Sequence, residues 1–214
     1  NNNVSEWKDL SGSDHHVSQS NGSRQPIYST SGGGSLDFNA SGRGLVMQNS
    51  DDIINDELTI VSVVNVVTFS GNSNVVAKSK NLAYRFRVEK NKNLWLLVND
   101  TGSNLEGKEG NSLTEEGENI IGVTYEGGDT KKIKFKDKNE VVEVATSKAS
   151  INDISGNLVI GNYDDGHINE YFHGTISEIL LFNKTLTDEE LAKVYYYLSK
   201  PIGSAVSLLS TLPS

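Results

Sequence analysis

The segment from Phe172 to Gly203 constrains the fold more than any other, because it joins a strand to a capped helix in one short stretch. Its first half holds the apolar run Ile176 to Phe182, and a run that is apolar on both faces predicts a strand buried between two layers. Thr187 precedes Glu190 by three residues, which is the spacing of a capping box at a helix start. Apolar residues then recur at helical spacing and predict that one helix face packs on the protein: Leu191, Val194, Tyr195 and Leu198.

The rest of the chain predicts short strands separated by polar turns. Leu58 to Phe69 is a nearly continuous apolar run, typical of a central strand, and Leu82 to Val88 alternates like a half-buried strand. The stretch Asn99 to Gly117 has little apolar content, so we expect a long polar loop there. Further strands are predicted at 94–98, 120–125, 131–136, 141–144 and 158–161. Many short strands with one terminal helix indicate an all-β sandwich of two antiparallel sheets.

The terminal segment resembles the C-terminal signature of laminin-G-like domains, of the bacterial and phage type, in the concanavalin A-like lectin/glucanase superfamily. That signature is a G-x-I-x-E strand, an aromatic residue, an L-T/S-x-x-E helix start and a Y-L pair. The matching residues are Gly174, Ile176, Glu178, Phe182, Leu186, Thr187, Glu190, Tyr197 and Leu198.

Three further segments resemble the same family in the same order. Trp7 to Gly12 is similar to its opening W-x-D-x-S-G, and Asn119 to Asn139 is similar to a hairpin of the family. Leu36 to Phe38 lies near the position of its early F-x-G turn, but the expected glycine is replaced by Asn39 or delayed to Gly42. The resemblance implies a concanavalin A-like jelly roll over residues 1–203, with residues 204–214 as a tail or linker.

Composition excludes several classes of protein. The 214 residues carry a net charge of −9, which argues against a nucleic-acid groove and against binding to an anionic membrane surface. No apolar run is long enough for a membrane span. The absence of cysteine excludes a disulfide scaffold. The chain begins with Asn1 rather than Met, so we expect a processed chain or a piece of a larger one.

The sequence lacks the acid pair that a glucanase of this superfamily would need. Such enzymes carry an E-x-D-x-x-E strand whose alternation directs the carboxylates into the sugar cleft. The glutamates 115, 116 and 118 have a different spacing, and Glu140 and Glu143 are expected on opposite faces of their strand. No nucleophile elbow or H-E-x-x-H motif is present either. We therefore expect a protein that is not an enzyme.

Sugar binding needs an aromatic surface beside amide or carboxylate groups. The polar loops offer such a set, and we predict a ligand site from these residues: Tyr163, Asp164, Asp165, Asn169, Tyr171, Asn72, Asn74 and Asp100. Trp95 is a further candidate, but its strand is apolar on both sides, so we expect it in the core.

Calcium is the candidate cofactor, with Asp164 and Asp165 as its predicted ligands. Calcium takes oxygen ligands from loops, and residues 162–170 place acids and amides between two strands. The alternative is a tight turn at Asp164-Asp165-Gly166, because Asp-Gly favours the dihedral angles of such turns.

The resemblance implies a non-catalytic, lectin-like recognition module that binds a glycan or a cell-surface receptor. We expect it in a phage fibre or decoration, or on a bacterial cell surface, outside the cell and without a membrane span. Its partners would include other virion or surface-protein subunits, with a homo-oligomer among the arrangements considered. The alternative is a structural virion subunit without sugar binding, and a glycoside hydrolase is a third hypothesis.

Overall fold

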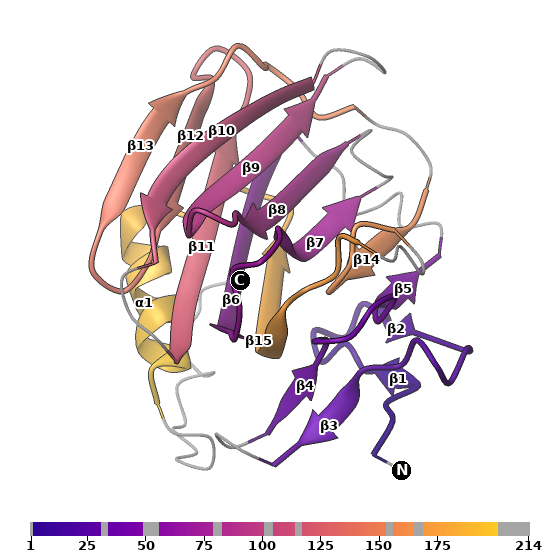
Figure 1. Ribbon diagram of the computed structural model, residues 1–214. Helices are drawn as coiled ribbons and strands as arrows, with labels where there is room; N and C mark the ends of the chain where they lie inside the picture. The colour runs from indigo at the N-terminus through magenta and orange to yellow at the C-terminus, as the bar shows by residue number, and fades with distance from the viewer. Residues whose placement is uncertain are drawn as a thin grey trace.

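The fold was analysed in a computed structural model, which describes residues 2–30, 34–48, 56–78, 83–100, 105–113, 117–152, 156–164 and 169–200. Two antiparallel sheets form the two layers of a sandwich (Figure 1). The predicted all-β sandwich of concanavalin A type is therefore confirmed. The expected tail at residues 204–214 lies outside the described residues, as does Asp165.

The first layer is an eight-stranded sheet in the order β1-β2-β5-β14-β7-β8-β9-β10. Its strands are β1 (Glu6–Trp7), β2 (Val17–Ser18), β5 (Leu45–Met47), β7 (Ser73–Lys78), β8 (Tyr84–Val88), β9 (Asn93–Asn99), β10 (Leu105–Ser112) and β14 (Leu158–Ile160).

The second layer is a seven-stranded sheet in the order β13-β12-β11-β6-β15-β4-β3. Its strands are β3 (Ile27–Ser29), β4 (Ser35–Asp37), β6 (Glu57–Val66), β11 (Glu118–Glu126), β12 (Lys132–Lys136), β13 (Val141–Ala145) and β15 (Gly174–Phe182).

The main core fills the space between the sheets and follows the alternation of the strands. Tyr84, Phe86 and Val88 of β8 are fully buried in this core, next to Leu94 and Leu96 of β9. Burying a large apolar side chain of this kind contributes about 2 kcal/mol to stability. Because side chains alternate along a strand, the buried positions of β8 and β9 also determine which of their residues face outward.

A second, smaller core lies under the helix α1 (Asp188–Leu198), on the other side of the seven-stranded sheet. Leu191, Tyr195 and Leu198 of the helix pack on Val61 and Val63 of β6. The predicted apolar helix face is thus confirmed. Figure 1 shows α1 in yellow beside the seven-stranded layer.

The predicted capping box is also confirmed. The backbone N–H of Glu190 donates to Thr187 Oγ1 at 3.2 Å, and the backbone N–H of Thr187 donates to Glu190 Oε2 at 2.8 Å. The strand before the helix is β15, which is covered on both sides as its sequence predicted. Ile179 and Leu181 contact the main core, whereas Leu180 and Phe182 contact the helix core.

One prediction was wrong. The stretch expected as a long polar loop contains β10, which pairs with β9 from Leu105 to Ser112 with a register shift after Glu109. β10 is the edge of its sheet and carries Glu, Lys and Gly instead of an apolar pattern. Edge strands tolerate such sequences because charged residues prevent pairing with other chains, so hydrophobic periodicity does not reveal them.

Within the described part of the chain, no helix has the length and apolar character that crossing a bilayer requires.

Candidate functional site

The face of the eight-stranded sheet that points away from the core carries two arginines. They alternate with the inward residues of β8, so Arg85 and Arg87 both point outward. Outward residues of a sandwich usually meet solvent, yet only 6% of Arg85 and 8% of Arg87 is exposed. Other groups must therefore cover them.

Trp95 of β9 is the first of these groups. It is paired with Arg87 across the sheet, and the Arg87 guanidinium carbon lies 3.9 Å from the centre of the indole ring. Arg85 lies 5.4 Å from the same ring. Cation–π contacts of this kind hold guanidinium groups flat against an aromatic surface.

The expectation that Trp95 belongs to the core is wrong. The residue is half-buried and belongs to neither core cluster. Leu97, the next outward residue of β9, pairs with Arg85 and is buried on the outer face of the sheet. The strand is therefore apolar on both sides, although the core covers only one of them. An apolar run thus shows that both faces are covered, but not that the core covers both.

The loop after β14 supplies the second cover. Its two ends are held together by a β-bridge between Asn162 and Tyr171, and Tyr163 N donates to the Glu170 carbonyl at 3.0 Å. The same carbonyl accepts from Asn74 Nδ2 at 2.6 Å, which fixes the loop to β7.

Tyr163 and Glu170 then reach Arg85 from this loop. The Arg85 guanidinium carbon lies 4.9 Å from the centre of the Tyr163 ring, and Nη1 lies 2.6 Å from Glu170 Oε2. We call this set the arginine face, and it consists of Asn74, Arg85, Arg87, Trp95, Tyr163 and Glu170.

The arginine face has polar atoms that the described residues leave unsatisfied. Within that part of the chain, buried Asn74 Oδ1 and Arg85 Nε have no hydrogen-bond partner. Burial lowers the pKa of Arg85, and the nearby charge of Arg87 lowers it further, while Glu170 counteracts both. Unsatisfied buried groups are costly, and they are often found where a ligand or water completes the bonding.

A histidine lies next to this face. The ring of His173 is 4.4 Å from that of Tyr171, its backbone N–H donates to Ser73 Oγ, and burial lowers its pKa. Among the described residues its Nε2 atom has no partner.

The structure brings most of the predicted ligand residues to this region. Tyr163, Asp164, Asn169 and Tyr171 belong to the loop just described, and Asn74 anchors it. Asn72 lies two residues before Asn74 and accepts from Lys90 N at 3.3 Å.

Asp100 lies elsewhere. It follows β9 at the end where Tyr84 pairs with Val98, whereas Asn74 pairs with Arg87 at the other end of β8. Its carboxylate forms an ion pair of 3.2 Å with the buried Lys148. Asp100 is thus separated from the other predicted ligand residues that the structure describes, at the opposite end of these strands.

The predicted calcium ligands are only partly described, because Asp165 lies outside the described residues and Asp164 inside them. In the described ranges, no three acidic or histidine side chains come close enough together to hold a metal ion. Calcium therefore stays a prediction.

Sequence reasoning missed Arg85, Arg87 and Glu170. A signal was available, because the sequence Tyr84-Arg85-Phe86-Arg87-Val88 alternates and therefore places both arginines on the outer face. The contribution of Glu170 could not be seen this way, because it depends on how the loop folds back over the sheet.

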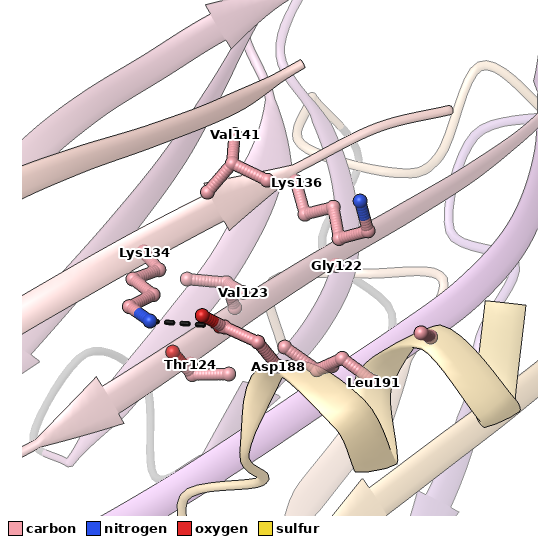
Figure 2. Close-up of a pocket in the computed structure, with 9 residues that line it drawn as sticks. Gly122, Val123, Thr124, Lys134, Lys136, Val141, Asp188 and Leu191 are labelled. Carbon is pink, nitrogen blue, oxygen red and sulfur yellow. Dashed lines mark hydrogen bonds and ion pairs between the residues drawn. The ribbon is translucent and has the colours of Figure 1, made fainter. Parts of the chain in front are cut away.

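A hollow lies at α1, on the other side of the sandwich (Figure 2). It lies between the helix and the strands β11 and β12, with Lys134, Lys136 and Asp188 at its wall. Lys134 Nζ is 2.8 Å from Asp188 Oδ1, and Lys136 Nζ lies 4.8 Å from the centre of the Tyr195 ring. The hollow offers a ligand less than the arginine face does, because both of its lysines have partners, whereas Asn74 Oδ1 and Arg85 Nε of the arginine face have none within the described residues.

Two glutamates bear on the glycosidase hypothesis. Burial raises the pKa of Glu178, and the charge of Glu118 raises it further. They lie on β15 and β11, in the seven-stranded sheet, and neither lines the hollow at α1. They are thus separate from the arginine face.

Comparison with known proteins identifies the fold. The sequence model of the family described as the concanavalin A-like lectin/glucanases superfamily matches residues 39–192. No curated protein matches the chain.

Solved structures share the fold at low sequence identity. The CBM40 module of the Ruminococcus gnavus IT-sialidase, bound to α2,3-sialyllactose, has a TM-score of 0.59 at 13% identity, over 75% of this chain and 95% of the module. A structure of botulinum neurotoxin type C, which interacts with two ganglioside molecules when it enters cells, has a TM-score of 0.62 at 9% identity, over 93% of this chain. Trypanosoma rangeli sialidase in complex with sialic acid has a TM-score of 0.65 at 14% identity, over 95% of this chain. This chain spans 52% of the neurotoxin chain and 32% of the T. rangeli sialidase.

Proposed function

The chain belongs to the concanavalin A-like lectin/glucanase superfamily, and from this premise we propose that it is a non-catalytic module that binds glycans through the arginine face. The observation that carries the proposal is the set of side chains over the outer side of β8 and β9. A tryptophan, a tyrosine, two arginines and a carboxylate meet there, and two of the buried polar atoms lack a partner within the described residues.

This set of side chains has the chemistry that a sugar requires. A pyranose has an apolar side that packs on an aromatic ring, and hydroxyl groups that bond to amide, guanidinium and carboxylate groups. The CBM40 module supports the proposal, because it was solved with sialyllactose and 95% of it is matched by this chain. Sialidases are enzymes, so we base the non-catalytic part on the CBM40 module and on the sequence, which lacks the acid-rich strand of the glucanases.

A glycan array tests the proposal, with the protein applied once with calcium and once with a chelator. The calcium arm also tests the predicted ligands Asp164 and Asp165. We expect at least one class of glycan to bind, and the variant Trp95→Ala to lose about tenfold or more in affinity.

Tyr196→Ala is the matched control, because it removes an aromatic ring that is 54% exposed on α1, away from the arginine face. It should bind like the wild type. If no glycan binds in either condition, or if both variants bind equally well, the proposal is wrong.

We further propose that the module acts outside the cell, on a virion or a bacterial surface, where glycans of a host or a neighbouring cell are accessible. Adsorption of a virion or cell to its host, measured with and without Trp95→Ala, tests this setting. Unchanged adsorption would contradict it.

A structural subunit without sugar binding is the second candidate. It is supported by Tyr196 and Tyr197, which are 54% and 55% exposed on the helix surface and could contact a neighbouring subunit. If this candidate is correct, replacing both tyrosines by Ser will disrupt the assembly of the subunits. The result of the glycan array will then be the same for the variant and the wild type.

A further inference from the structure

The two arginines of the arginine face are paired with acids in different ways. Arg87 Nε donates to Glu89 at 2.6 Å, and the two side chains are only 10% and 13% exposed. Arg85 is equally buried, at 7% exposure, but the side chain of its partner Glu170 is 34% exposed. The first pair is therefore closed to solvent on both sides, whereas the second is accessible from the side of its acid.

Glu170 also differs from Glu89 in what holds it. Its backbone carbonyl is fixed by Tyr163 and Asn74, but its carboxylate contacts Arg85 from a loop that folds over the sheet. A side chain can rotate away while its backbone stays in place. The carboxylate thus occupies the position through which a ligand would reach Arg85.

Arg85 favours an additional or a better acceptor. Its Nε atom has no partner within the described residues, and burial lowers the pKa of Arg85, as does the neighbouring charge of Arg87. A guanidinium group presents a planar fork that matches a carboxylate with two parallel hydrogen bonds. Glu170 uses one nitrogen of this fork, Nη1, at 2.6 Å.

We propose that Arg85 binds the carboxylate of an acidic sugar, which takes the place of the Glu170 carboxylate. This inference rests on the proposed function and specifies its ligand class. Trp95 and Tyr163 border the same guanidinium group, so the ring that carries the acid would lie beside an aromatic surface. Glu170 then acts as a built-in competitor that keeps Arg85 paired when no ligand is bound.

The test compares oligosaccharides that end in sialic or uronic acid with the same compounds as methyl esters. Esterification removes the charge and leaves the rest of the sugar unchanged. We expect the wild type to bind the acids at least about tenfold more tightly than the esters, as charge-assisted hydrogen bonds require.

Variants then assign the effect to Arg85. Glu170→Gln removes the competitor, so it should tighten binding of the acids by about three- to tenfold and leave the esters unchanged. Arg85→Lys keeps the charge but loses the fork, so it should weaken binding of the acids by about tenfold. Glu109→Gln is the control, because it makes the same charge change on neighbouring β10, where Glu109 accepts from Asn93.

Each outcome decides between the hypotheses. Tighter binding by Glu170→Gln, together with a change of less than about twofold for Glu109→Gln, supports the exchange. Equal binding of acids and esters, or weaker binding of acids by Glu170→Gln, overturns it but leaves glycan binding intact. If no glycan binds to the wild-type protein, both this inference and the proposed function are wrong.

Discussion

The indole ring of Trp95 lies over Gly107, which is diagonally opposite on β10, and occupies the space that a side chain at Gly107 would need. A Cβ atom at this position would overlap ring atoms of the indole. Gly107 thus lets Trp95 lie on the outer face of the sheet, where Arg87 contacts it.

The first prediction follows from this contact. Gly107→Ala should displace the indole ring and weaken glycan binding by about five- to tenfold, because the aromatic surface moves. The melting temperature should fall by only a few degrees, because the change lies at an edge strand outside the core. Titration calorimetry and thermal unfolding measure the two effects.

Gly22→Ala is the control for this change, because a Cβ there would meet no atom within 4 Å. It should leave affinity and melting temperature unchanged. Wild-type affinity in Gly107→Ala would show that the position of the indole ring does not matter for binding.

The second prediction concerns Glu106, which connects the edges of the two sheets. It lies on β10, and its carboxylate accepts from Thr146 Oγ1 at 2.5 Å and from Ser147 N at 2.7 Å, just after β13. Burial alone would raise the pKa of Glu106, but Lys108, Thr146 and Ser147 lower it to about 2.

The lowered pKa of Glu106 makes the stability of the folded protein depend on pH. A carboxyl group whose pKa is lower in the folded state stabilises the protein above the pKa of the unfolded chain, 4.5, and this contribution disappears as the pH falls to about 2. Allowing for its partial exposure, we expect the contribution to be about 2 kcal/mol.

Glu106→Gln tests this expectation. The variant should have a lower free energy of unfolding than the wild type at pH 7, and the difference should vanish near pH 2. Urea unfolding at several pH values measures it. A difference that does not change with pH would mean that the ionised carboxylate is not responsible.

The sequence predicted those features of the fold that depend on residues close together in the chain. The capping box at Thr187 and the stripe that ends at Leu198 depend on residues within a few positions of each other, and the structure has both. β10 was missed because an edge strand is specified by its neighbour β9 rather than by its own apolar pattern.

The candidate site shows the same limit. The outward direction of Arg85 follows from alternation, but its contact with Glu170 joins residues 85 positions apart. Trp95 illustrates the opposite error, because Arg85 and Arg87 of the neighbouring strand β8 provide the cover that the sequence pattern assigns to the core. Contacts between distant segments therefore define the arginine face, and the sequence alone does not show them.

The third prediction concerns His173, whose pKa is lowered by burial beside the arginine face. The folded state then binds its proton less readily than the unfolded chain, so stability should decrease as the pH falls below 6.5, the ordinary value for histidine. His173→Gln should unfold with a weaker dependence on pH between 7 and about 5 than the wild type.

Denaturant unfolding at several pH values measures this dependence. If His173→Gln keeps the pH dependence of the wild type, that dependence arises from other groups.

The fourth prediction concerns the start of α1. Thr187→Ala removes the hydroxyl that accepts from Glu190 N, so it should lower the free energy of unfolding by about 1 kcal/mol. Thr187→Ser keeps an acceptor at the same place and should recover most of the loss. Because the helix covers Val61 and Val63 on the side of the sandwich away from the arginine face, glycan affinity should stay unchanged in both variants. Denaturant unfolding and the glycan titration together check this, and a loss of affinity in Thr187→Ala would show that the two faces of the sandwich are coupled.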